Sequence, residues 1–276
     1  MKLIFTLLSL GSLGYGLWWF AGEHPEVKHK IESYIKISEV DALEIRHTPE
    51  QIMEDHRRTL LRKSGATYLS PILKFYPYLL LEVKFTPSNN KTKEGIILWD
   101  LTDGEMVIDS EDWEKTHGFC DCIQMSVQDQ EFKILQYLSK KGKVSDEAKM
   151  AEELKTECNV LDIWLKNCIR KGLVVASQDG YRLHLEKPNL AQIPETKLKR
   201  APVTKPFKAS YKVSQQFSSA KIERMAKVAF GKGFSIRRSS LIYLPVYNIT
   251  VQNPNGSVHT SFWNASNGIR LPSALF

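Results

Sequence analysis

The feature that most constrains this chain is an internal repeat whose two copies lie far apart in the sequence. Pro245 lies 168 positions after Pro77, and a tryptophan and then a glycine follow each of these prolines. The shared anchors are Pro77, Trp99 and Gly104 in the first copy and Pro245, Trp263 and Gly268 in the second. Because the anchors keep one order along the chain, they predict two related folding units with other sequence inserted between them.

Each copy has the pattern of a helix followed by an antiparallel sheet. In the first copy, Thr48 and Gln51 have the spacing of a capping box, and Gly65 ends the helix predicted over residues 49–63. In the second copy, Ser218 is the predicted N-cap. Strand-forming residues, a polar turn and a second strand ending in Asp-Gly or Asn-Gly follow each helix. We therefore expect two α+β units, each with its helix laid on its own sheet.

The end of the second predicted strand carries a short acidic motif in the first copy only. The motif is Trp99-Asp100-Leu101-Thr102-Asp103-Gly104-Glu105, and the second copy lacks the two aspartates and the glutamate. With the helix and hairpin before it, this motif resembles a PepSY-like unit, a small α+β module of membrane and secreted proteins, over about 48–109 and 218–272. The resemblance implies an interaction or regulatory domain that binds polypeptide near a membrane and has no catalytic residues. We expect Trp99 and Trp263 to close the two cores rather than to stack on a ligand.

Residues 128–187, between the copies, predict three short helices and a two-stranded hairpin. Ser145 is the expected N-cap of the second helix. The third helix, over about 157–171, is expected to supply the core with Val160, Ile163, Trp164, Leu165, Cys168 and Ile169. This order of elements resembles a winged-helix domain. A DNA-reading helix needs Arg, Lys, Asn or Gln at its exposed start, whereas Glu157 and Asp162 occupy that region here. The pattern therefore favours a structural or protein-contact role over DNA binding.

The amino terminus has the composition of a membrane span. No charged residue occurs from Leu3 to Gly22, which is long enough for a helix to cross the hydrocarbon core of a bilayer. We expect residues 1–22 to be an uncleaved anchor held in membrane lipid through residues 3–22, in preference to a cleaved signal peptide or a buried helix. The lysines of the connecting segment 23–47 favour a cytoplasmic body.

The formal net charge of +7 is concentrated at the carboxyl end of the chain. Residues 188–276 hold 13 Lys and Arg against two Asp and Glu, whereas residues 65–127 hold five against ten. By composition, 188–217 is a linker, which we expect to be a flexible, solvated spacer. The predicted surface for an anionic partner consists of Lys197, Lys199, Arg200, Lys205, Lys208, Lys212, Arg237 and Arg238. Lipid headgroups, nucleic acid and the acidic first copy are its three candidate targets.

The sequence holds no recognised catalytic motif. A Gly-x-Ser-x-Gly elbow, a Gly-rich phosphate loop and a His-Glu-x-x-His pair are all absent. His117, Cys120 and Cys122 have the chemistry of metal ligands, but no fourth ligand stands at a recognised spacing, so we expect core packing there. We therefore expect a non-enzymatic protein without catalytic residues, metal or cofactor.

These patterns predict an α+β protein in which two related helix-plus-antiparallel-sheet units flank a winged-helix-like domain behind an N-terminal transmembrane helix. The predicted order is an anchor (1–22), a connecting segment (23–47), the first unit (48–127), the winged-helix-like domain (128–187), a linker (188–217) and the second unit (218–276). The predicted function is that of a membrane-anchored interaction or regulatory protein with a polypeptide partner. The alternative is a membrane-tethered nucleic-acid-binding regulator that uses the winged helix and the basic third.

Overall fold

The computed structural model describes residues 38–87, 91–142, 144–199, 201–209 and 211–272. Within this part of the chain the protein is α+β, with a mixed eight-stranded sheet and seven helices. The predicted transmembrane helix and the predicted turn at 88–90 lie outside the described residues. Among the helices that are described, none is long and apolar enough to cross a membrane.

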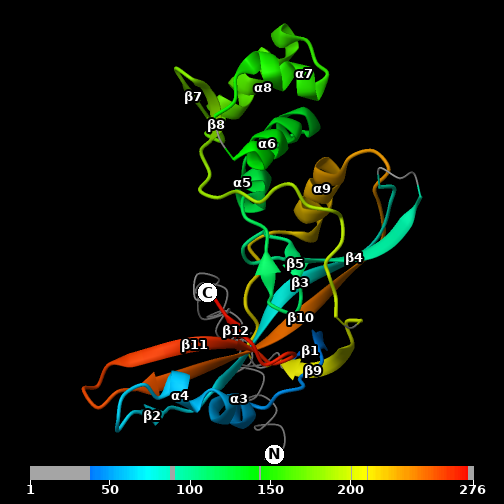
Figure 1. Cartoon of the computed structure of the whole chain (residues 1–276). Coiled ribbons are helices and arrows are strands. Elements are labelled where there is room, and N and C mark those ends of the chain that lie inside the picture. The colour runs from blue at the N-terminus through cyan, green and yellow to red at the C-terminus, as the bar shows by residue number, and fades with distance from the viewer. Residues whose placement is uncertain (1–37, 88–90, 143, 200, 210, 273–276) are drawn as a thin grey trace, which may run out of the picture.

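The sheet is built around two long antiparallel strands, β3 and β10 (Figure 1). Its strands are β1 (Ser38–Leu43), β2 (Thr67–Tyr68), β3 (Ile72–Phe85), β4 (Lys93–Asp100), β9 (Thr204–Ala209), β10 (Ser235–Gln252), β11 (Val258–Asn264) and β12 (Arg270–Leu271). β4 pairs with β3 and β11 pairs with β10, so that two hairpins extend in opposite directions. β1 runs parallel to β10 and antiparallel to β9, which makes the sheet mixed.

The pairing of β3 with β10 is symmetric about its centre. Pro77 faces Tyr243, and Phe75 faces Pro245. Tyr243 lies 168 positions after Phe75, and Pro245 lies 168 positions after Pro77. The two prolines are therefore 168 positions apart, and so are the two residues that face them in this ladder.

In each copy, the second strand of the hairpin leads into a turn that we call a corner. The first corner is Asp100–Glu105 and the second is Asn264–Ile269. The two corners are tied to the sheet in the same way. Leu101 donates its N–H to the Pro77 carbonyl at 3.0 Å, and Ala265 donates its N–H to the Pro245 carbonyl at 3.0 Å. The anchor glycines close the two corners at φ of 76° and 75°, a conformation that favours glycine.

Helices α3 (Pro49–Asp55) and α9 (Ser219–Phe230) occupy equivalent places in the two copies. Thr48 and Gln51 form the predicted capping box at the start of α3, and Ser218 is the N-cap residue of α9. The helix predicted over 49–63 is interrupted at His56, where the short α4 (Arg57–Leu60) begins. The His56 ring lies on the Trp263 ring of β11, with 4.4 Å between centroids.

The helices are exchanged between the copies. α9 belongs to the second copy but packs with the strands β3 and β4 of the first, whereas α3 and α4 pack on β10 and β11 (Figure 1). Phe217, just before α9, donates its N–H to the Leu101 carbonyl, and His47, just before α3, donates to the Ala265 carbonyl, both at 3.0 Å. The expectation that each helix lies on the sheet of its own copy is therefore wrong. The residue just before each helix is hydrogen-bonded to the corner of the other copy, which places the helix on the strands of that copy.

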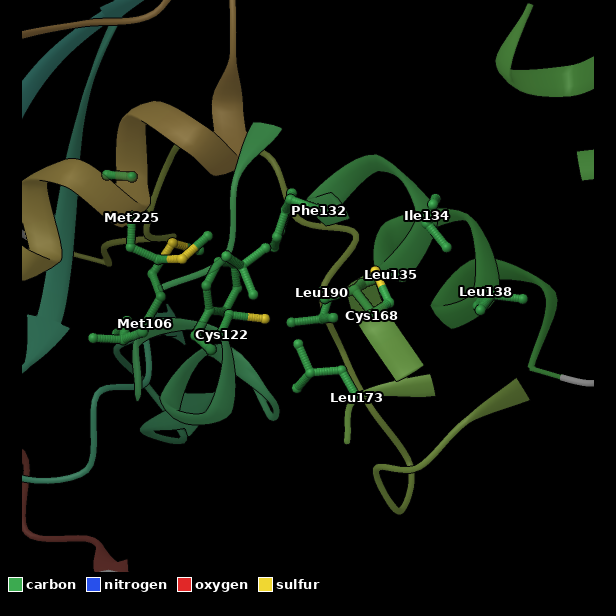
Figure 2. Packing of buried hydrophobic residues seen from close by; sticks show 14 of the residues in the cluster. Met106, Cys122, Phe132, Ile134, Leu135, Leu138, Cys168, Leu173, Leu190 and Met225 are labelled. Atoms are coloured by element: carbon green, nitrogen blue, oxygen red, sulfur yellow. The ribbon is translucent and has the colours of Figure 1, made fainter. Parts of the chain in front are cut away.

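A further group of elements follows the first corner and covers the end of the first unit (107–127) and residues 128–187 (Figure 1). They are β5 (Val107–Asp109), β6 (Glu114–Lys115), α5 (Phe119–Gln124), α6 (Asp129–Lys141), α7 (Glu147–Leu154), α8 (Cys158–Arg170), β7 (Val174–Ser177) and β8 (Gly180–Leu183). The buried apolar residues of α5, α6, α7 and α8 belong to the same core cluster as Leu79 of β3, Ile97 of β4 and Ile222 of α9. Figure 2 shows this continuity from Met225 of α9 past Cys122 of α5 to Phe132 of α6 and Cys168 of α8.

Two details of this segment correct the sequence analysis. The N-cap of α7 is Asp146, whose carboxylate accepts the Lys149 N–H at 3.0 Å, while Ser145 exchanges backbone hydrogen bonds with Tyr181 of β8. On α8 only Leu161, Leu165 and Cys168 are buried, because they repeat at the spacing of one helix face. Ile163 and Ile169, expected in the core, lie outside that stripe and are exposed.

The linker over 188–217 is also more ordered than a solvated spacer. The Thr196 hydroxyl, which is buried, donates to the Val107 carbonyl at 2.7 Å and accepts the Leu98 N–H at 2.9 Å. Farther along, β9 pairs with β1 over six residues. Because its backbone and hydroxyl groups are bonded to β1, β4 and β5, the linker forms a strap across the sheet.

Candidate interaction sites

Most of the predicted anionic-partner residues form ion pairs within the chain. The pairs are Lys197 with Asp109, Lys199 with Glu111, Lys205 with Glu44, Arg237 with Glu94 and Arg238 with Glu82. Lys208 lies opposite Glu39 in the register of β9 with β1. Lys212 follows β9, and Arg200 lies outside the described residues. The structure therefore brings the basic residues together with carboxylates of the amino-terminal part of the chain, rather than into one unpaired patch.

The pairs of Lys197, Lys199 and Lys205 join the strap to the rest of the molecule. Lys197 Nζ lies 2.7 Å from Asp109 Oδ2, and the hydrogen bond from Lys197 holds the pKa of that carboxyl below its usual range. The Lys197 and Ser110 backbone amides add two bonds between the same segments, at 2.8 and 3.0 Å. Exposed ion pairs stabilise a fold only slightly. These pairs therefore orient the strap, and the buried hydrogen bonds of Thr196 contribute most of the stabilisation of its attachment.

The acidic motif of the first corner surrounds one buried lysine. Lys115 of β6 places Nζ 2.5 Å from Asp100 Oδ2 and 2.8 Å from Asp103 Oδ2, with only 7% of its side chain exposed. The same ammonium lies 5.5 Å from the centroid of the Tyr78 ring. Burial, and after it the charge of Asp100, raises the pKa of Asp103 to about 6. Two carboxylates and one cation thus attach β6 to the sheet.

Glu105, the last residue of the motif, holds the start of α5. Its buried carboxylate accepts the N–H groups of Gly118 and Cys120 at 2.9 and 3.0 Å and the Thr116 hydroxyl at 2.7 Å. These amides have no partner inside the helix, so a carboxylate there satisfies them. All three acidic residues of the motif therefore have structural partners within the chain.

The outward face of α8 carries an exposed apolar side chain. Ile163 is 59% exposed in the middle of this helix. Asp162 and Lys166 beside it form an ion pair of 2.6 Å with each other. This face therefore offers an apolar side chain between charges that neutralise one another. The sequence signal that could have found Ile163 is its position outside the stripe of Leu161, Leu165 and Cys168.

A cavity of about 400 Å³ lies between the strap and the two copies. The end of β1, the loop from β5 to β6, the strap and the second corner each contribute residues. Its apolar lining comes from Leu43, Leu98, Trp113, Leu198 and Ile269. Sequence reasoning missed this cavity because its lining comes from segments that are far apart in the chain, and none of them carries a local motif.

The predicted alternative of metal ligation by His117, Cys120 and Cys122 gains no support. Cys122 is buried in the core, and Cys120 Sγ accepts a hydrogen bond from Gln124 at 3.4 Å. Burial, followed by the charge of Asp121, raises the pKa of Cys120 to about 11, which disfavours a reactive thiolate. Across the described part of the chain, no three His, Cys, Asp or Glu residues are grouped to hold a metal.

Comparisons of this chain with models of protein families, with curated proteins and with solved structures found no match. The assignment of function therefore rests on the geometry described above.

Proposed function

We propose that this chain is a membrane-anchored, non-enzymatic interaction protein that binds a polypeptide partner through the outward face of α8. The observation that carries the proposal is Ile163, which is 59% exposed at the centre of that helix. Beside Ile163, Asp162 and Lys166 form an ion pair with each other. An exposed apolar residue between paired charges suits a protein surface better than a phosphate backbone.

We also propose that the chain contains two copies of one α+β unit. Residues 48–127 and 218–276 are two related units with exchanged helices, and 128–187 is a winged-helix-like domain inserted after the first. Recurrent hydrogen bonds support the duplication: Asp100 Oδ1 accepts the Thr102 N–H at 2.6 Å, and Asn264 Oδ1 accepts the Ser266 N–H at 2.8 Å. The order of α6, α7, α8 and the hairpin β7–β8 supports the second assignment.

Nucleic-acid binding is the alternative that these observations favour less. Electrostatic attraction to phosphates depends on cations that are free to replace counterions. Five of the eight predicted cations are instead paired with carboxylates of this chain. The cations of α8 lie toward its carboxyl end, where Lys166 is paired with Asp162.

Site-specific photocross-linking tests the proposed partner class. A benzophenone amino acid replaces Ile163 in the full chain in native membranes, and a matched protein carries it at Val258, which is 61% exposed on β11. We expect a discrete, protease-sensitive adduct from position 163 and none from position 258. Identical adducts from both positions, a nuclease-sensitive adduct at 163, or no adduct would contradict the proposal.

The anchor is tested separately, since it lies outside the described residues. We propose that residues 1–22 hold the chain in the membrane with a cytoplasmic body, and the uncharged stretch from Leu3 to Gly22 supports this. Carbonate-washed membranes should retain the intact protein, and a thiol reagent added outside intact cells should not label the exposed Cys158. Release by carbonate would refute the anchor, and labelling from outside would refute the orientation.

A further inference from the structure

Helix α9 carries three exposed cations whose side chains have no partner in the described part of the chain. Lys221, Arg224 and Lys227 follow one another at intervals of three residues, so they lie on one side of the helix. Among the described residues, none of these three side chains forms an ion pair or a hydrogen bond. They differ in this from Arg237 and Arg238 of β10, which are paired with carboxylates.

Two of these cations line a small crevice between α5 and α9. The crevice has a volume of about 70 Å³, and its lining is Cys122, Ile123, Ser126, Val127, Lys221, Arg224 and Met225. No carboxylate of the described residues lines it, whereas glutamates line the cavities of about 400 and 520 Å³ elsewhere in the molecule. Burial raises the pKa of Cys122, so this thiol adds no negative charge. The crevice is therefore positively charged.

Ser126 supplies a hydroxyl group at the same crevice. This exposed residue has φ of 48°, and its carbonyl accepts hydrogen bonds from Gln128 Nε2 at 2.9 Å and from Lys171 Nζ at 3.4 Å. Its hydroxyl forms no hydrogen bond within the described part of the chain. Lys171 brings a further ammonium group to this region, and its carboxylate partner Glu131, at 2.6 Å, is buried. The donors that line the crevice are therefore free to bind an anion.

We propose that this crevice binds the phosphate group of a phosphate monoester, whose oxygens accept hydrogen bonds from Lys221, Arg224 and Ser126. A monoester carries about two negative charges at neutral pH and three strong acceptor oxygens, which match two cations and one hydroxyl. The volume accommodates a phosphate group but not a nucleobase. The ester belongs either to a lipid headgroup or to a small soluble molecule. The crevice is separate from α8, so its occupancy does not depend on the proposed polypeptide partner.

The test uses the full chain in detergent micelles, with the methionine methyl groups labelled with carbon-13. Methyl phosphate is titrated at about pH 7.5, where it is mostly a dianion. The methyl signal of Met225 reports on the crevice, and that of Met150, which is buried in α7, is the internal control. We expect a saturable shift at Met225 with Kd of about 1 mM, and no shift at Met150. Methyl sulfate has the same shape but a single charge, and should bind at least about fivefold more weakly.

Three substitutions separate a defined site from general attraction to a basic helix. Arg224→Gln removes a cation that lines the crevice and should raise the Kd about tenfold. Lys227→Gln removes an exposed cation of the same helix that does not line the crevice, and should change the Kd by less than about twofold. Ser126→Gly removes the hydroxyl but tolerates the φ of 48°, and should raise the Kd about threefold to fivefold. All three positions are exposed, so the variants should fold normally.

A lipid probe identifies the source of the phosphate. Dioctanoyl phosphatidic acid is held in the micelle and should shift the Met225 signal only if the crevice faces the membrane. A shift with this lipid assigns the ester to a lipid headgroup. A shift with methyl phosphate alone supports the site equally and assigns the ester to a soluble molecule.

A short DNA duplex with hydroxyl groups at its 5′ ends carries only phosphodiesters, and should leave the Met225 signal unchanged. The inference would be overturned by a shift with this duplex, by an equal response to methyl sulfate, or by equal losses from Arg224→Gln and Lys227→Gln. The absence of a saturable shift up to about 20 mM methyl phosphate would also overturn it. None of these results involves the cross-linking at Ile163. Failure of the phosphate site is therefore distinguishable from failure of the proposed function.

Discussion

At the scale of single residues, the arrangement around Lys115 explains why the acidic motif is present in one copy only. In the first copy, Asp100 and Asp103 share the buried ammonium of Lys115. In the second, Asn267 occupies the position of Asp103 and donates from Nδ2 to the Ser110 carbonyl at 3.1 Å. Only the first corner is followed by the segment from β5 to α5, and its two aspartates bind Lys115 of that segment.

Lys115→Met is expected to destabilise the protein by about 3–5 kcal/mol, because it leaves two carboxylates without their buried partner. Urea unfolding followed by fluorescence measures the loss. Lys141→Met is the matched control, since Lys141 forms an exposed pair with Glu153, and it should cost less than about 1 kcal/mol. Equal effects of the two substitutions would contradict the structural role of Lys115.

The raised pKa of Asp103 predicts a specific pH dependence. A carboxyl whose folded pKa of about 6 exceeds its unfolded value binds protons more tightly in the folded state. Its contribution to stability is therefore present at low pH and is lost as the pH rises through about 6. Between pH 5 and 7 the native protein should lose about 1 kcal/mol relative to Asp103→Asn. Parallel unfolding curves of the two proteins across this range would show that the pKa is not raised.

At the scale of elements, the sequence predicted most helices and strands but not which helix covers which sheet. The N-caps at Thr48 and Ser218 follow from local spacing. The expected core of α8 omits Leu161, which is buried, and includes Ile163, which is exposed. The exchange of α3 and α9 does not, because an amphipathic helix shows that it has an apolar face without showing what that face contacts. Only the hydrogen bonds of His47 and Phe217 to the opposite corners determine the pairing.

Two matched substitutions test the exchange. Ile222 of α9 and Ile52 of α3 are both buried, and each change to alanine should cost about 2–5 kcal/mol. Ile222→Ala should speed amide exchange in β3 and β4, and Ile52→Ala should speed it in the carboxyl half of β10 and in β11. Hydrogen exchange read by mass spectrometry distinguishes these patterns. Loosening of each helix's own copy in place of the other would show that the helices are not exchanged.

At the scale of the whole molecule, the charge division seen in the sequence becomes a set of internal contacts. The acidic first copy was one of three targets predicted for the basic third, and Lys197, Lys199, Arg237 and Arg238 all pair with carboxylates of that copy. The composition could indicate complementary charges, but it could not distinguish an internal partner from an external one. That distinction depends on the strap and on the β3–β10 ladder, which are tertiary features.

The two candidate sites differ in how far the sequence could have revealed them. Ile163 is expected in the core from its apolar character, although the spacing of Leu161, Leu165 and Cys168 places it outside the buried face of α8. The cavity is not visible, because Ser266, Trp113 and Leu43 meet only after β1, the strap and the second corner have packed together.

Titration of a short labelled DNA duplex with the full chain in detergent, followed by fluorescence anisotropy, tests the central claim most directly. If the partner is a polypeptide and not a nucleic acid, no saturable binding should occur at micromolar protein at about 50 mM salt. Saturable binding that weakens steeply between about 50 and 200 mM salt would contradict the claim. It would show that the basic third engages phosphates in spite of its internal partners.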